Sequence, residues 1–176
     1  MQLERTAAAG EQEATGDRRR TYSWADPAPA AAAALKLDGD AFFAELTEGR
    51  LPMPPVMQTL GFTATHVRDG VARFELDPAE FQYNPIGSVH GGVIATVCDS
   101  ACGCAVHSLL PAGAYYSSLD LSVKFLRRVT AETGHLVCEG TVVHLGARSA
   151  LAEAKLTGTD GKIYARATSS CMIFRP

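Results

Sequence analysis

One segment limits the folds open to this chain more than any other. Residues 93–110 form an apolar run, rich in Ala, Val and Cys, in which Asp99 is the only carboxylate. A helix that is apolar on nearly every side must be surrounded by protein, so this run predicts a long buried helix. Gly91 and Gly92 come directly before the run and predict where the helix begins.

Strand patterns lie on both sides of this helix. Arg68-Asp69-Gly70 separates two of them, and an Asp-Gly pair suits the positive φ angles of a tight hairpin turn. The connections after the helix are too short for crossovers, which predicts antiparallel pairing. The predicted strands are residues 62–67, 71–76, 115–126, 136–145, 149–157 and 162–174, with a short helix over 40–47. The expected fold is therefore α+β, with an antiparallel sheet of about five to six strands wrapped around one long buried helix.

The stretch 115–126 alternates between apolar and polar residues. Its apolar set is Leu119, Leu121, Val123 and Phe125, and its polar set is Ser118, Asp120, Ser122 and Lys124. A period of two predicts that the first set faces the core and the second set faces water. Such a sheet has open edges, and pairing two edges across a two-fold axis removes them, so we expect a dimer.

The N-terminal residues differ from the rest in composition. They are rich in Ala, Glu, Arg and Pro, include the run Arg18-Arg19-Arg20, and show no apolar period over the first twenty residues. This composition predicts a disordered extension over residues 1–38 and one folded domain over residues 39–176. The arginine run is typical of a solvated segment. Pro52, Pro54 and Pro55 predict an extended segment before the hairpin.

Charge and hydropathy exclude several classes of protein. The net charge is −3 and the isoelectric point about 5.9, which gives no broad positive field for nucleic acid or an anionic membrane. Every apolar stretch is broken before the roughly 20 residues of a membrane helix. The first residues lack the apolar core of a secretory signal. We therefore expect a cytoplasmic protein that binds neither nucleic acid nor membranes.

The five cysteines do not resemble a disulfide framework, because their number is odd and three lie in one short segment. Cys102 and Cys104 form a C-x-C pair, but without a second pair of ligands this is weak evidence for a metal. Free cysteine is commonly buried, so Cys102 and Cys104 are predicted to be small apolar core residues. We expect neither a metal nor a cofactor.

The start of the helix has the features of an oxyanion site. The first N–H groups of a helix lack intrahelical partners and lie at the positive end of its dipole, and glycine lets another molecule approach them. A thioester carbonyl at Gly91 would have its developing negative charge stabilised there. Asp99 lies about two turns further on, roughly 11 Å along the axis. One chain cannot easily place both groups at one carbonyl, whereas two antiparallel helices of a dimer can.

Structural roles compete with these assignments. Gly-Gly before a helix is common in ordinary loops, and a lone histidine such as His90 is more often a hydrogen-bonded structural residue than a base. A carboxylate in an apolar helix needs a reason, because burying an unpaired charge is costly. Asp99 either faces a cleft or caps a neighbouring loop.

Apart from these physical arguments, the run from Asn84 to Asp99 closely resembles the signature of PaaI-type hotdog thioesterases. Its sequence is N-P-I-G-S-V-H-G-G-V-I-A-T-V-C-D. These enzymes form a branch of the 4-hydroxybenzoyl-CoA thioesterase-like superfamily. The later S-S-L-D-L-S-V-K-F-L-R, residues 117–127, resembles the central strand of that branch. The resemblance covers roughly residues 39–174 and implies the hotdog fold and hydrolysis of acyl-coenzyme A thioesters.

The resemblance also implies roles for individual residues. Asp99 would be the general base or the nucleophile, and the backbone amide of Gly91 would polarise the thioester carbonyl. Asn84 would assist near that carbonyl, His90 would support the loop, and Ser118 would position water or the carboxylate. It further implies sites shared by two subunits, pairs of dimers and no prosthetic group. Acyl specificity stays open, and arylacetyl or medium-chain groups are the first expectation.

Two departures from the family pattern are visible. The chain has Arg127-Arg128 where members often have Arg-Pro, and the additional charge would be placed to contact coenzyme A phosphates. The N-terminal extension of nearly 40 residues is longer than usual, and no role follows for it from the sequence.

Two other functions fit the fold. A hotdog hydratase or dehydratase of enoyl thioesters would use His90 and Asp99 as an acid/base pair. A non-catalytic acyl-coenzyme A-binding module would bind thioesters without turnover. Within the thioesterase hypothesis, the sequence does not choose between attack by water and an anhydride on Asp99.

Overall fold

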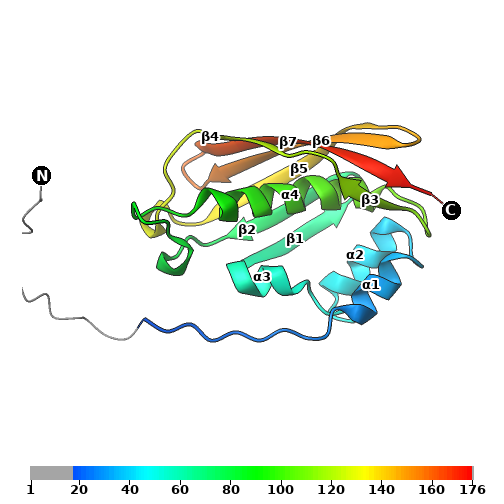
Figure 1. The fold of residues 1–176 in the computed structure, drawn as a ribbon, viewed down its shortest axis with the longest axis horizontal. Coiled ribbons are helices and arrows are strands. Elements are labelled where there is room, and N and C mark those ends of the chain that lie inside the picture. Colours follow the sequence, from blue (N-terminus) through cyan, green and yellow to red (C-terminus); the bar gives the residue numbers. More distant parts are fainter. Residues whose placement is uncertain (1–17, 176) are drawn as a thin grey trace, which may run out of the picture.

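A computed structural model describes residues 18–175, and its fold is a seven-stranded antiparallel sheet with one long helix across one face (Figure 1). The helices are α1 (Ala28–Ala34), α2 (Gly39–Thr47), α3 (Pro55–Leu60) and α4 (Gly91–Ser108), with short 3-10 helices η1 (Glu80–Gln82) and η2 (Ala131–Thr133). The strands are β1 (Phe62–Arg68), β2 (Val71–Leu76), β3 (Tyr115–Ser118), β4 (Ser122–Phe125), β5 (Leu136–Leu145), β6 (Ser149–Gly158) and β7 (Ile163–Phe174). Their order is β1-β2-β5-β6-β7-β3, with β4 also on β7. The expected hotdog arrangement, a sheet around one helix, is confirmed.

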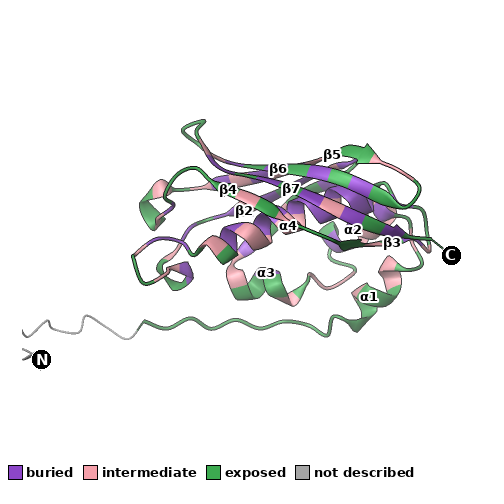
Figure 2. Cartoon of the chain, turned by 45° about the horizontal axis from the view of Figure 1, so that its top comes forward, coloured by how far each residue is buried: buried purple, intermediate pink, exposed green. Residues whose placement is uncertain are grey.

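Small residues let the sheet approach α4 closely. From Ser149 to Leu156, β6 alternates between exposed and buried residues, and three of the buried ones are alanines (Figure 2). On β5, a Cβ added at Gly140 would lie only 2.3 Å from the carbonyl oxygen of Ala101 in α4. The absence of a side chain at Gly140 therefore sets the distance between helix and sheet.

The β1–β2 hairpin forms as the sequence predicts. Asp69 and Gly70 both have positive φ angles, 52° and 78°, which matches the twist that two-residue hairpin loops need. The predicted short helix is confirmed as α2, where the side chain of Asp38 accepts a hydrogen bond from the Ala41 N–H at 2.9 Å.

The predicted strand over residues 115–126 is two strands, which is why the sheet has seven strands and not five or six. Both β3 and β4 pair with β7, but three residues, 119–121, lie opposite only Ser169 and Ser170. The extra residue forms a β-bulge. Residues before and after the bulge that are an even number apart therefore point to opposite faces of the sheet. Ser118 is paired with the buried Cys171, so it lies on the helix-facing side of the sheet. The prediction that Ser118 shares the outer face with Ser122 is wrong for this reason.

Two helices have no counterpart in the sequence prediction. Pro55, expected in an extended segment, is the first residue of α3, a position where proline is favoured because its missing N–H has no partner anyway. The Ala-rich stretch 28–34 forms α1, which has no buried residue. Part of the predicted disordered extension, residues 1–17, lies outside the described residues, and the domain boundary at residue 39 stays a prediction.

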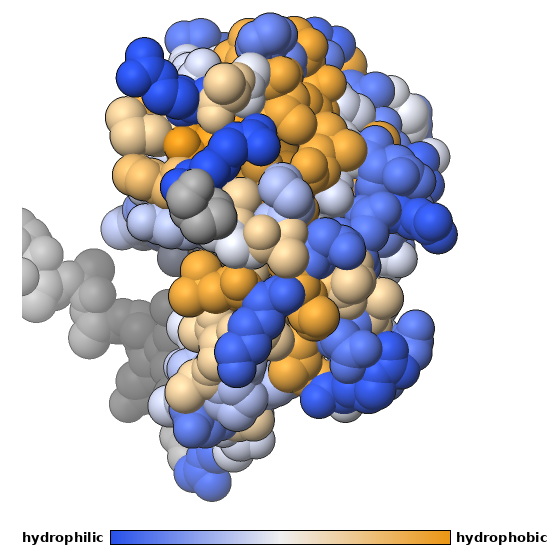
Figure 3. Space-filling view, turned by 90° about the vertical axis from the view of Figure 1, so that its right-hand side faces the viewer, coloured by the Kyte–Doolittle hydropathy of each residue, from blue (hydrophilic) through white to orange (hydrophobic). Residues whose placement is uncertain are grey.

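Apolar side chains remain exposed at the sheet edge formed by β3 and β4. Leu119 and Phe125 are 60% and 55% exposed, and Tyr115 stacks on Phe174 with ring centroids 4.7 Å apart. Figure 3, which views the end of the molecule where β3 and the C-terminal end of β7 lie, shows a broad hydrophobic area. Among residues 18–175, no helix is both long enough and apolar enough to cross a membrane.

Candidate active site

The first half of α4 leaves one strip of the helix uncovered. Gly92 is exposed, and Thr96, Asp99 and Ser100 follow it at helical spacing and are half-buried. The helix is therefore not surrounded on every side within one protomer. The Ser118 hydroxyl on β3 donates a hydrogen bond to Asp99 Oδ1 at 3.1 Å. Asp99 therefore reaches solvent and is also tied by a hydrogen bond, which comes from a strand and not from a neighbouring loop.

The start of α4 presents a free backbone donor. His90 is the N-cap, and its Nδ1 accepts a hydrogen bond from the Gly92 N–H at 2.9 Å. The next amides, of Val93 and Ile94, bond to the His90 carbonyl oxygen. Within residues 18–175 the Gly91 N–H alone of this first turn has no hydrogen-bond partner. It lies at the positive end of an 18-residue helix, as an oxyanion donor must.

His90 acts here as a structural residue. Its ring is exposed, and its Nδ1 must be unprotonated to accept the bond from Gly92, which places the proton of the neutral ring on Nε2. Its N–H donates to the Gln82 carbonyl oxygen at 2.8 Å. His90 therefore holds both the helix start and the preceding loop. The role in the site that the resemblance implies for it stays a prediction.

Asn84 shapes the loop that leads into α4. Its Oδ1 accepts hydrogen bonds from the N–H groups of Ile86 and Ser88 at 3.1 and 3.2 Å, and its Nδ2 donates to the Ser88 hydroxyl at 3.1 Å. Its carboxamide is thus engaged in the turn, and a direct role for Asn84 at a substrate carbonyl stays a prediction.

Two residues of the site had no signal in the sequence. Gln82 is only 4% exposed and joins three segments. Its side-chain Nε2 donates a hydrogen bond to the Leu60 carbonyl oxygen at 2.7 Å, and its backbone carbonyl oxygen accepts one from the His90 N–H. The ring of Phe125 lies against the start of α4, since a Cβ at Gly91 would be 3.1 Å from it. A glutamine in a loop and one aromatic residue in an alternating strand predict neither contact.

The thiols around Asp99 are not candidates for the nucleophile. Burial, with a smaller contribution from the Asp99 charge, raises the pKa of Cys104 to about 12. Burial also raises the pKa of Cys102 to about 12, aided by Cys98 and Asp99. The prediction of a buried core residue is confirmed for Cys102, while Cys104 is half-buried; Cys98, Cys138 and Cys171 are also fully buried. Thiols with a raised pKa are not reactive at neutral pH.

The structure groups the five predicted residues into two sets. Asp99 and Ser118 contact one another midway along α4, and Asn84, His90 and Gly91 lie together at its start. Eight residues of helical rise, about 12 Å, separate Asp99 from Gly91 along the axis. For the same reason His90 and Asp99 form no acid/base pair within one protomer, which is the pair that a hydratase requires.

Hollows surround the start of α4. One of about 540 Å³ is lined by Asn84, Gly91, Phe125 and the pair Arg127-Arg128. Another, of about 360 Å³, lies beside His90 and Gly92. The first of these hollows can receive a ligand beside Gly91.

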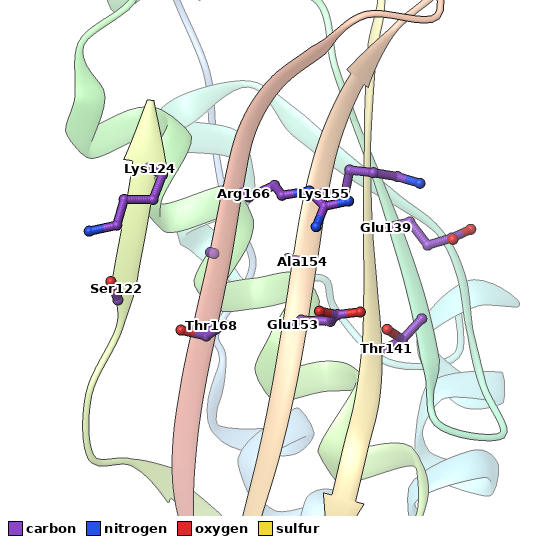
Figure 4. A pocket seen from close by; sticks show the side chains of 10 residues that line it. Ser122, Lys124, Glu139, Thr141, Glu153, Ala154, Lys155, Arg166 and Thr168 are labelled. Atoms are coloured by element: carbon purple, nitrogen blue, oxygen red, sulfur yellow. The ribbon is translucent and has the colours of Figure 1, made fainter. Parts of the chain in front are cut away.

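A separate hollow of about 390 Å³ lies on the opposite face of the sheet. It is lined by charged side chains from four strands, including Lys124, Lys155, Arg166, Glu139 and Glu153, which stand on the side turned away from α4 (Figure 4). None of the five predicted site residues lines it. In residues 18–175, no group of three or more His, Cys, Asp or Glu side chains is arranged to hold a metal ion.

Comparisons with known proteins agree with this arrangement. Residues 86–165 match the Thioesterase superfamily. A Halobacterium salinarum protein that carries the name of an esterase is 34% identical over 103 residues, which is 56% of this chain and 66% of that protein's length. A phenylacetic acid degradation-related protein from Ralstonia eutropha has 30% identity and a TM-score of 0.67, covering 74% of this chain and 98% of that structure. A thioesterase family protein from Silicibacter pomeroyi has 28% identity and a TM-score of 0.64, over 70% and 91%. The chain belongs to the thioesterase superfamily and is a hotdog-fold thioesterase.

Proposed function

We propose that the protein hydrolyses acyl-coenzyme A thioesters to the free acid and coenzyme A. The observation that carries this proposal is the unpartnered Gly91 N–H at the positive end of α4, beside a hollow that can receive a carbonyl group. Asp99 supplies the carboxylate, and Ser118 holds it by a hydrogen bond. Membership of the thioesterase superfamily supports hydrolysis of a thioester as the reaction.

In the proposed reaction, the thioester oxygen accepts a hydrogen bond from the Gly91 N–H, which stabilises the oxyanion as it forms. Asp99 takes a proton from water while the water oxygen bonds to the carbonyl carbon. The C–S bond then breaks, the carbonyl re-forms, and the thiolate of coenzyme A leaves and accepts the proton. Alternatively, Asp99 attacks the carbonyl directly and forms an anhydride that water then cleaves, with the same groups. In ¹⁸O-labelled water, this route alone leaves ¹⁸O in the carboxylate of Asp99.

Each site is proposed to form between two protomers. The separation of Gly91 and Asp99 along one helix requires that Asp99 come from a partner whose α4 runs antiparallel. The edge formed by β3 and β4 supports such pairing, because its strands bond to β7 on one side and expose Leu119 and Phe125. Dimers of this kind then pair into tetramers.

The acyl group is proposed to be arylacetyl or medium-chain. The relative from Ralstonia eutropha, described as phenylacetic acid degradation-related, supports the arylacetyl class as the first to test. The surroundings of Gly91 are apolar on the side of Ile94, Phe125 and Leu126, which favours a hydrophobic acyl group over a charged one.

The test of this proposal is thiol release, measured with Ellman's reagent, from a panel of acyl- and arylacetyl-coenzyme A thioesters. We expect turnover by the wild type and a fall of about 10²–10⁴-fold in Asp99→Ala and in the isosteric Asp99→Asn. The melting temperature should stay unchanged in both variants, because Asp99 is half-exposed and makes one side-chain hydrogen bond. Turnover that survives both substitutions would contradict the assignment of Asp99.

A complementation experiment tests the shared site. Gly91→Pro removes the N–H donor at a helix position that accepts proline, while Gly91→Ala adds a Cβ and keeps the donor. We expect about a 10²–10³-fold loss for Gly91→Pro and a much smaller one for Gly91→Ala. Mixing Gly91→Pro with Asp99→Asn subunits should restore about a quarter of wild-type activity, because half the dimers are mixed and each has one intact site. No restoration would contradict a site built from two protomers.

A further inference from the structure

The N-terminal arginine run is attached to the folded domain. Residues 18–26 run in an extended course past α3 (Figure 1). The Arg20 guanidinium donates hydrogen bonds to the carbonyl oxygens of Thr59, at 2.9 Å, and Gln58, and lies over the Phe81 ring at 4.0 Å from its centroid. Arg18 pairs with Glu80 at 2.7 Å. The run therefore has a defined place on the protein, although its side chains are exposed.

That place is the wall of a hollow that is larger than the two at the start of α4. The hollow has a volume of about 760 Å³ and lies between residues 18–20 and the segment from Glu80 to Gly87, which leads into α4. It shares Asn84 with the 540 Å³ hollow that contains Gly91. A long ligand whose reacting end lies at Gly91 can therefore extend past Asn84 to the arginine run.

The two hollows are basic in a chain that is acidic overall. Three arginines and one carboxylate, Glu80, line the outer hollow, a net of two positive charges. Arg127 and Arg128 line the inner hollow, and no carboxylate does. Arg128 also donates a hydrogen bond to the Gly87 carbonyl oxygen at 2.8 Å, so it holds the same loop from the other side. With a net charge of −3 for the whole chain, this basic region is a local feature.

A coenzyme A thioester matches the two adjoining hollows in length and in charge. Its thioester end is uncharged, its pantetheine arm is polar and flexible, and its nucleotide end bears the phosphates. Guanidinium groups bind phosphate oxygens through paired, charge-assisted hydrogen bonds. The arginines of the outer hollow lie beyond Asn84 as seen from Gly91, where the nucleotide of a substrate with its thioester at Gly91 would extend.

We propose that Arg18 and Arg19 of the N-terminal extension bind the phosphates of the coenzyme A nucleotide, with Arg20 as the anchor that places them. The proposal rests on the proposed function, because it concerns the substrate of that same site. It gives the extension a role in selecting coenzyme A thioesters over thioesters that lack the nucleotide.

The alternative is that the arginine run only holds the N-terminal segment on the domain. Substitution of Glu80 distinguishes this structural role from phosphate binding. If the run only fastens the N-terminal segment, breaking the Arg18–Glu80 pair from either side has the same effect. If the run binds phosphate, Arg18→Ala removes a binding group, whereas Glu80→Gln removes a competing carboxylate. The two substitutions then change the affinity for coenzyme A in opposite directions.

Binding is measured by calorimetry with coenzyme A, 3′-dephospho-coenzyme A and pantetheine. We expect Arg18→Ala/Arg19→Ala to raise the Kd of coenzyme A about tenfold or more and Glu80→Gln to lower it a few-fold. Pantetheine binding should be the same in all variants. The matched control Arg148→Ala/Arg175→Ala removes two exposed arginines that line neither hollow and should leave the Kd unchanged.

Kinetics with one acyl group on coenzyme A and on N-acetylcysteamine complete the test. The double variant should raise KM for the first thioester, leave kcat unchanged and leave the second thioester unaffected. An equal loss on both thioesters, or the same direction of change in Arg18→Ala and Glu80→Gln, would overturn the proposal. Because the calorimetry needs no turnover, absence of hydrolysis would overturn the proposed function and leave the result on phosphate binding standing.

Discussion

The two halves of α4 have different tasks. From Gly91 to Asp99, four of nine residues are buried, and the half-exposed ones include the free N–H of Gly91 and the carboxylate of Asp99. From Ser100 to Ser108, seven of nine are buried. One helix therefore carries exposed polar groups at its start and is fixed in the core at its end.

This division explains how polar groups are held in place without being buried. The second half packs against β5, where Gly140 allows contact with Ala101, and its last turn lies among the rings of Phe42, Phe43 and Tyr116 around His107. Groups on a rigid element keep their position better than groups on a loop. Substitutions in the first half should therefore change activity, and substitutions around the second half should change stability.

The largest effect is expected at Gly140. In Gly140→Ala the new Cβ would lie 2.3 Å from the Ala101 carbonyl oxygen, a backbone atom, so the close contact between β5 and the second half of α4 must open. We expect a loss of about 2–3 kcal/mol in the free energy of unfolding, measured with urea, and an unchanged kcat per folded molecule. Gly146→Ala is the matched control, since its nearest contacts are at 3.3 Å. A large fall in kcat of folded Gly140→Ala would break the division between the halves.

A smaller effect, on activity alone, is expected at Ser118. Ser118→Ala removes the hydrogen bond to Asp99, and we expect kcat/KM to fall about tenfold. This is the lower end of the range for a hydrogen bond to a charged group, because Ser118 is exposed. Ser118→Thr keeps the hydroxyl and should restore most of the activity. Ser117→Ala, on the opposite face of β3, should change nothing. Equal losses in Ser117→Ala and Ser118→Ala would show that strand packing, and not the hydroxyl, is responsible.

The sequence predicts the elements of the fold better than it predicts their contacts. The start of α4 at Gly91, the turn at Asp69-Gly70 and the bounds of β5 follow from local patterns, and the structure confirms them. Helix α3 was missed because a proline that begins a helix looks the same as one in an extended segment.

The side-chain partners in the site depend on distant residues. The inward position of Ser118 follows from a bulge, which depends on the register with β7 about fifty residues later in the sequence. The role of Gln82 depends on the carbonyl of Leu60, 22 residues earlier. Periodicity within a segment carries no information about either partner. The free N–H of Gly91, in contrast, is a property of any helix start and was predicted for that reason.

The smallest effect is expected at His107, in the second half of α4. Burial lowers the pKa of His107, which is 7% exposed among three aromatic rings, with Tyr116 the only other titratable group among them. The unfolded chain therefore binds the proton more readily, so this contribution to stability is complete above the unfolded pKa of about 6.5 and is lost as the pH falls through the folded pKa. In His107→Gln the free energy of unfolding should vary less between pH 6 and pH 7, by less than about 1.4 kcal/mol. The matched control is His144→Gln, at an exposed position of β5. If His107→Gln instead altered the pH profile of kcat with stability unchanged, the second half of α4 would belong to the site as well.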